Sequence, residues 1–119
     1  MHPQTEQMVT MHTIRVKIED KNIEIIDDVV EVKGGHLVKW VNIQDNEPFC
    51  IIFKYNNNKN QNANGKESPF WVEELSYDGA TAFQRVSWGG KFKYTLILDS
   101  DHNRRVDPVV DVDPPTYPY

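Results

Sequence analysis

The chain has 119 residues, which is the size of one ordinary domain. Its 39% hydrophobic and 26% charged residues are typical of a soluble globular protein and exclude a disordered or membrane-spanning class. Thirteen Lys and Arg against eighteen Asp and Glu give a net charge of −5, so we expect no broad binding to nucleic acid or to anionic membranes. The single cysteine, Cys50, excludes an internal disulfide and any zinc site with several cysteines.

Residues 1–12 show no hydrophobic period, so we expect a flexible N-terminal arm. The arm lacks the basic start and the apolar core of about 7–15 residues that a secretory signal needs. We therefore expect a cytoplasmic protein.

The next segments alternate between apolar and polar residues, which predicts half-buried strands. The first strand runs from Thr13, with Ile14, Val16 and Ile18 on one face. Residues 23–26 and 30–33 predict two further short strands. Gly34-Gly35 predicts a two-residue hairpin turn, and a strand over about 36–43 follows it. Both faces of that strand are largely apolar, so we expect it at the centre of a sheet.

Residues 49–53 predict another strand, with Phe49, Ile51 and Phe53 on one face. Residues 56–69 hold six asparagines and no large apolar residue, which indicates a solvated loop. The loop is either a recognition tip or a tolerated surface insertion, since a long insertion costs little loop-closure entropy.

The C-terminal half continues in extended segments. Residues 70–75 are compatible with one helical turn or with a short strand, and residues 82–87 predict an extended segment. Residues 91–99 show the clearest alternation, and residues 106–112 predict the last strand. A charged turn, 101–105, lies between these two strands.

This pattern predicts an all-β fold, an antiparallel Greek-key β-sandwich of about seven or eight strands. We expect the sandwich domain to span residues 13–113. The tail over residues 114–119 is Pro- and Tyr-rich and cannot continue a sheet ladder.

Three segments together carry a family resemblance. Residues 30–42 contain a strand, a glycine turn and a strand ending in Trp40-Val-Asn42. Residues 88–96 contain glycines followed by alternating aromatic residues, and residues 107–112 suit a closing strand. In this order and spacing they resemble the cupredoxins, and the resemblance implies a cupredoxin-like sandwich over residues 13–112.

A cupredoxin holds type 1 copper with two imidazoles, a thiolate and usually a thioether. The resemblance places Phe49 at the first histidine position, or Cys50 in an alignment shifted by one residue. It places Leu96 at the cysteine position and Asp99 near the second histidine, and no methionine follows Met11. We therefore expect no type 1 copper, no other cofactor and no electron transfer, with Phe49 and Leu96 filling the core.

Other reactive chemistry finds little support in the sequence. The four histidines, at positions 2, 12, 36 and 102, show no metal-binding spacing, and Cys50 lies among apolar neighbours that favour an inert core residue. The stretch 99–103 resembles the start of a calcium loop, but Arg104 stands where that loop needs glycine. A solvated turn is the better interpretation. We expect no catalytic residue and no enzymatic activity.

Aromatic residues are the remaining candidates for a binding site. Trp71, Tyr77 and Trp88 lie near predicted loops, where they either form a recognition surface or cap an open end of the sandwich. Tyr117 and Tyr119 lie in the Pro-rich tail, which can dock as an extended segment in a partner's aromatic groove, pack on its own domain or stay disordered.

We therefore expect a non-catalytic binding module, with another protein or a second copy of the chain as the partner. One alternative is a metalloprotein with an atypical copper site that uses His2, His36 or Cys50. The other is a carbohydrate-binding sandwich, which requires an exposed row of Trp71, Tyr77 and Trp88.

Overall fold

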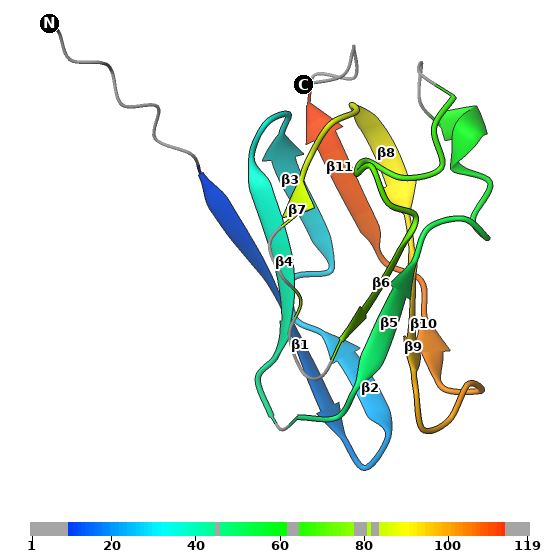
Figure 1. Ribbon diagram of the computed structural model, residues 1–119. Helices are drawn as coiled ribbons and strands as arrows, with labels where there is room; N and C mark the ends of the chain where they lie inside the picture. Colours follow the sequence, from blue (N-terminus) through cyan, green and yellow to red (C-terminus); the bar gives the residue numbers. More distant parts are fainter. Residues whose placement is uncertain (1–9, 45, 62–64, 78–80, 82–83, 114–119) are drawn as a thin grey trace, which may run out of the picture.

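The computed structural model describes residues 10–44, 46–61, 65–77, 81 and 84–113, and they form a two-layered β-sandwich (Figure 1). The expected fold class is therefore confirmed. The strands in chain order are β1 (Met11–Glu19), β2 (Asn22–Ile25), β3 (Val29–Lys33), β4 (Leu37–Asn42), β5 (Phe49–Ile52), β6 (Glu74–Tyr77), β7 (Gln84–Arg85), β8 (Gly90–Lys93), β9 (Thr95–Leu98), β10 (Arg105–Val106) and β11 (Val109–Asp113). One short 3₁₀ helix, η1 (Asn58–Gln61), interrupts this pattern within the described residues.

The first layer has the strand order β2-β1-β4-β7. The predicted alternation in β1 is confirmed, because Ile14, Val16 and Ile18 are buried while their neighbours face outward or lie at the margin. A tight turn with positive φ at Asp20 and Lys21 joins β1 to β2. The strand β4 lies inside this layer, as its two apolar faces predicted, and it runs parallel to β1.

The second layer consists of two short sheets, β3-β11-β8 and β10-β9-β5-β6, that continue into each other. Only Tyr94 separates β8 from β9, and its backbone N–H donates to the carbonyl of Pro108 at 2.9 Å, between β10 and β11. The predicted strand over 91–99 is thus β8 and β9 together. The predicted strand over 106–112 is likewise divided into β10 and β11, and the described residues contain eleven short strands.

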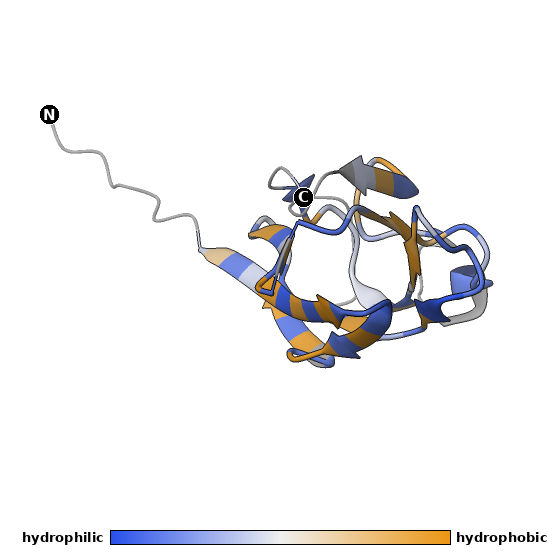
Figure 2. Cartoon of the chain, turned by 90° about the horizontal axis from the view of Figure 1, so that it is seen from below, coloured by the Kyte–Doolittle hydropathy of each residue, from blue (hydrophilic) through white to orange (hydrophobic). Residues whose placement is uncertain are grey.

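The core lies between the layers and is dominated by large aromatic side chains. Trp40, Phe53 and Tyr94 are fully buried and pack against one another, with the Trp40 and Tyr94 ring centroids 5.3 Å apart. The indole Nε1–H of Trp40 donates to the Tyr94 hydroxyl at 2.9 Å. Figure 2 shows the alternating hydrophobic and hydrophilic bands along the strands that supply this core. The hydrogen bond satisfies a polar group that the surrounding apolar side chains could not.

The Gly34-Gly35 pair is not a hairpin turn, which corrects the sequence prediction. The strands on either side belong to different layers, since β3 pairs with β11 and β4 pairs with β1. The glycines instead form a corner between the layers, where Gly35 takes a φ of +87°. A hairpin turn and a corner between layers both need a residue with positive φ, so the glycine pair alone could not distinguish them.

The strand β1 begins at Met11, slightly before the predicted start at Thr13. Most of the expected arm, residues 1–9, and the expected tail, residues 114–119, lie outside the described residues. In the described part of the chain, no helix has the length and apolar character needed to cross a membrane.

Candidate functional site

Two of the positions that the cupredoxin resemblance assigns to copper ligands lie inside the sandwich core. Phe49 begins β5 and Leu96 lies in β9, and both side chains are fully buried. In the antiparallel pairing of these strands, Phe49 lies opposite Leu98, and Ile51 lies opposite Leu96. Neither Phe49 nor Leu96 has a side-chain atom that could coordinate copper, so this region of the core is packed with hydrocarbon.

Cys50 is not the core residue that its apolar neighbours predicted. It lies on the outer face of β5, partly exposed, where its Sγ donates to Asp99 Oδ1 at 3.1 Å and lies 3.3 Å from Ser76 Oγ. Partial burial raises the pKa of the Cys50 thiol, and the Asp99 carboxylate raises this pKa further. The protonated thiol is a poor nucleophile and a poor metal ligand.

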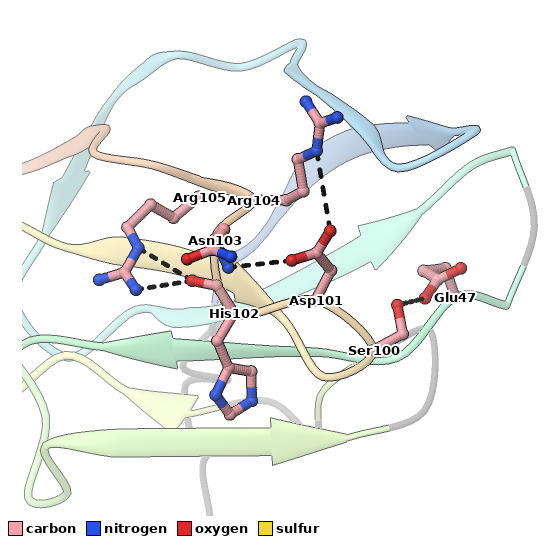
Figure 3. Close-up of polar contacts among 7 residues, drawn as sticks. All are labelled: Glu47, Ser100, Asp101, His102, Asn103, Arg104 and Arg105. Carbon is pink, nitrogen blue, oxygen red and sulfur yellow. Dashed lines mark hydrogen bonds and ion pairs between the residues drawn. The ribbon is translucent and has the colours of Figure 1, made fainter.

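The charged turn between β9 and β10 is held by hydrogen bonds among its own residues and by one from Ser100 Oγ to Glu47 Oε2 at 2.8 Å (Figure 3). The Asp101 carboxylate accepts from the backbone N–H of Asn103 at 3.1 Å and lies 3.9 Å from Arg104 Nε. The carbonyl of His102 accepts from the Arg105 guanidinium, with Nη2 at 2.6 Å. Within the described residues no group of three or more His, Cys, Asp or Glu side chains is placed to hold a metal ion. These contacts agree with a solvated turn rather than a calcium loop.

The predicted aromatic residues separate into an exposed and a buried member. Trp71 is 74% exposed, whereas Trp88 is 6% exposed, and their ring centroids lie 4.4 Å apart in an edge-to-face arrangement. Lys66 Nζ lies 4.6 Å from the centroid of the Trp88 ring. Tyr77 lies in β6 opposite Phe49, but its side chain is outside the described part, as are Tyr117 and Tyr119. The two described side chains therefore form a corner in which Trp71 is exposed and Trp88 is buried.

This corner forms part of a surface hollow of about 360 Å³, here called the Trp71 hollow. Phe70, Trp71 and Trp88 supply its apolar surface, and the loop before β6 supplies a charged rim; the hollow is lined by Lys59, Gly65, Lys66, Glu67, Ser68, Phe70, Trp71, Glu73 and Trp88. Glu67 Oε1 lies 3.8 Å from Lys59 Nζ, while Glu67 Oε2 is buried and has no hydrogen-bond partner among the described residues. A buried carboxylate oxygen without a donor is costly, so a donor brought by a ligand would be favourable there.

A buried asparagine fixes the loop that forms the rim. Asn58 Nδ2 donates to the carbonyls of Glu67 and Lys93 at 2.8 Å each, and the backbone N–H of Lys93 donates to Asn58 Oδ1 at 2.9 Å. The side chain therefore pairs with β8 as a neighbouring strand would. The prediction of a wholly solvated loop is wrong at this residue, and composition alone could not distinguish one buried asparagine from its exposed neighbours.

The fold also brings together two histidines that no spacing in the sequence connected. Because β1 and β4 run parallel, His12 Nε2 lies 3.0 Å from His36 Nδ1, and the two rings stack with centroids 5.1 Å apart. Partial burial lowers the pKa of His12, and the charge of His36 lowers this pKa further. The spacing of the histidines in the sequence did not predict this contact, because it depends on the parallel pairing of distant strands.

Comparison with solved structures finds amicyanins. A reduced Cu(I) form of an amicyanin variant at pH 4 matches with 14% sequence identity and a TM-score of 0.46, covering 92% of this chain and 87% of the other. The reduced state of a second amicyanin variant matches with 18% identity and a TM-score of 0.48, covering 85% and 82%. The chain resembles these proteins at the level of the fold. No family model matches the chain, and no curated protein matches it.

Proposed function

We propose that this chain is a non-catalytic, cupredoxin-like protein-binding module that works without type 1 copper and binds its partner at the Trp71 hollow. The observation that carries the proposal is the exposed indole of Trp71 standing against the anchored Trp88. Exposed tryptophans beside a preformed hollow are frequent energetic centres of protein interfaces.

The rigidity of the hollow supports a binding role. Trp88 belongs to the buried core, and Asn58 ties the opposite rim to β8 through two short hydrogen bonds with Lys93 and holds Glu67 through a third. A surface that is already ordered loses little conformational entropy when a partner docks. Its volume, about 360 Å³, lies at the lower end of the range for ligand pockets and suits one or two side chains of a peptide.

The chemistry of the hollow favours an extended segment rich in proline and tyrosine. Such segments are stiff before binding, and they dock against aromatic rings with little ordering cost. A tyrosine hydroxyl is also a donor of the kind that Glu67 Oε2 lacks. The chain itself carries a segment of this composition at residues 114–119.

Strand β11, which directly precedes that segment in the chain, ends close to the residues that carry Trp88. Val112, near the end of β11, lies opposite Gly90, which is two residues from Trp88. A second copy of the chain therefore offers both the hollow and a segment suited to it. Self-association through residues 114–119 is the form of partner binding that we propose to test first.

The absence of a type 1 copper centre is the other half of the proposal. The buried side chains of Phe49 and Leu96 support it, because replacing them with ligands would open the core. The raised pKa of the Cys50 thiol supports a non-catalytic role for the one cysteine, since a thiol needs to ionise before it attacks.

The test is an isothermal titration calorimetry experiment in which a synthetic peptide of residues 113–119 is added to the full chain. We expect saturable binding that is weakened about tenfold or more by Trp71→Ala, because truncating a central aromatic contact costs at least about 1.4 kcal/mol. Tyr55→Ala is the matched control, since Tyr55 is 70% exposed but does not line the hollow. Equal affinities for the two variants, or no binding to the unmodified chain, would refute the proposed docking mode.

A further inference from the structure

The contact between His12 and His36 has the dimensions of a pair of metal ligands. Their facing nitrogens, Nε2 and Nδ1, are 3.0 Å apart. Two imidazole nitrogens bound to one zinc or copper ion at about 2.0–2.1 Å lie about 2.9 Å apart at a right angle and about 3.3 Å apart at the tetrahedral angle. The observed separation falls inside this range, so the backbone already brings both ligands to the required spacing.

Backbone hydrogen bonds fix the segments that carry both histidines. His12 lies in β1, and the backbone N–H of His36 donates to the carbonyl of Lys33 at 3.1 Å, in the corner that leads into β4. The parallel pairing of β1 with β4 starts at Met11 and Leu37, directly beside the two histidines. Little ordering is therefore needed to bring the second ligand to an ion bound by the first.

The charge around the pair suits a cation. His12 also lines an open hollow that contains Asp27, Asp28 and Glu31. Asp27 is engaged by Arg15, with Arg15 Nε 3.0 Å from its Oδ2, while Asp28 and Glu31 are exposed. These carboxylates attract a divalent ion toward the strand end without belonging to its ligand set, because no third ligand joins the pair among the described residues.

We propose that His12 and His36 together bind a divalent first-row transition-metal ion, with water completing the coordination and Cu²⁺ bound more tightly than Ni²⁺ or Zn²⁺. The order follows from the general preference of nitrogen ligands among these metals. When the ion binds, the imidazole whose hydrogen lies between the two rings transfers it to its other ring nitrogen. Both facing nitrogens then present lone pairs to the metal.

This site is distinct from the copper site of a cupredoxin. The family's ligand positions lie at the start of β5 and along β9, whereas His12 and His36 lie at the start of β1 and before β4 (Figure 1). In the ribbon drawing these are opposite ends of the sandwich. The proposed ion has no thiolate ligand, and it is independent of the Trp71 hollow.

The test is a calorimetric titration of the untagged full chain with Cu²⁺ and with Zn²⁺. We expect one ion per chain, and an affinity that falls about tenfold or more in both His12→Gln and His36→Gln. His102→Gln is the matched control, because His102 is exposed and does not belong to the pair of His12 and His36. His2→Gln separates the site from chelation by the N-terminus. Circular dichroism of each variant establishes that the sandwich is intact.

A second measurement identifies the ligands directly. Zn²⁺ added to chain labelled with ¹⁵N should shift the ring nitrogens of two histidines, and these signals should be absent in His12→Gln and His36→Gln. The proposal is overturned if neither substitution weakens binding, if His2→Gln alone abolishes it, or if no histidine ring signal moves at saturating Zn²⁺.

Discussion

Replacing Tyr94 with Phe should destabilise the sandwich through one lost hydrogen bond. The Trp40 Nε1–H donates to the Tyr94 hydroxyl at 2.9 Å, and both side chains are fully buried. Tyr94→Phe keeps the ring that packs on Trp40 but removes the acceptor. The indole N–H is then buried without a partner, which costs about 1–3 kcal/mol.

Equilibrium unfolding in urea, followed by tryptophan fluorescence, measures this cost. We expect a lower midpoint with an unchanged slope, because the surface exposed on unfolding stays the same. Trp40→Phe and the double variant complete a double-mutant cycle. The coupling between the two positions should exceed about 0.5 kcal/mol, as for residues in direct contact. A Tyr94→Phe variant as stable as the unmodified chain would show that the hydrogen bond does not stabilise the core.

The same residue predicts the response to alkaline conditions. Burial is the main cause that raises the pKa of Tyr94 above its usual value of 10.0. As the pH rises, the Tyr94 hydroxyl ionises in the unfolded chain before it ionises in the folded chain. The stability that the neutral hydroxyl contributes to the fold is therefore fully present below about pH 10 and is lost as the pH rises beyond it. Tyr94→Phe should lose less stability than the unmodified chain between pH 9 and pH 11. An equal loss in both proteins would contradict the assignment to Tyr94.

Three further predictions concern Asn58, Cys50 and Trp71. Asn58→Ala should lower the free energy of unfolding, measured by urea denaturation, by at least about 2 kcal/mol, because it leaves backbone groups of Lys93 and Glu67 without partners. A loss below about 0.5 kcal/mol would contradict the role of Asn58 in fixing the loop. Asp99→Asn should speed alkylation of Cys50 by iodoacetamide at neutral pH, because it removes a charge that raises the thiol pKa; an unchanged rate would mean that Asp99 does not control this pKa. Trp71→Ala should change stability by no more than about 0.5 kcal/mol in the same urea assay, whereas a large loss would make Trp71 a structural residue.

The strands could be predicted from the sequence because their signal is local. In a strand every second side chain lies on the same face. This period places Ile14, Val16 and Ile18 in the core without knowledge of the strands that they pair with. The same alternation holds in β8, where Phe92 is buried between the exposed Lys91 and Lys93, whereas every residue of β9 is buried. The local signal failed at Gly34-Gly35, because a glycine pair does not say whether the next strand joins the same sheet.

The site residues depended on contacts between distant segments, and local pattern could not supply these contacts. His12 and His36 meet only because β1 and β4 pair in parallel across two intervening strands. Cys50 has apolar neighbours in sequence, yet its side chain contacts Asp99, which directly follows β9, the strand paired with β5. Trp71 was named from the sequence as an aromatic residue near a loop, but its contact with Trp88 could not be predicted from the local pattern.

The visible absorption and paramagnetic resonance spectra of the untagged chain, recorded after addition of one equivalent of Cu²⁺, test the central claim most directly. That claim is that a cupredoxin-like sandwich here carries hydrocarbon at Phe49 and Leu96 in place of a copper centre. We predict no intense thiolate-to-copper charge-transfer band and the same spectrum in Cys50→Ser. An intense band that Cys50→Ser abolishes would contradict the account and identify the chain as a thiolate-ligated copper protein.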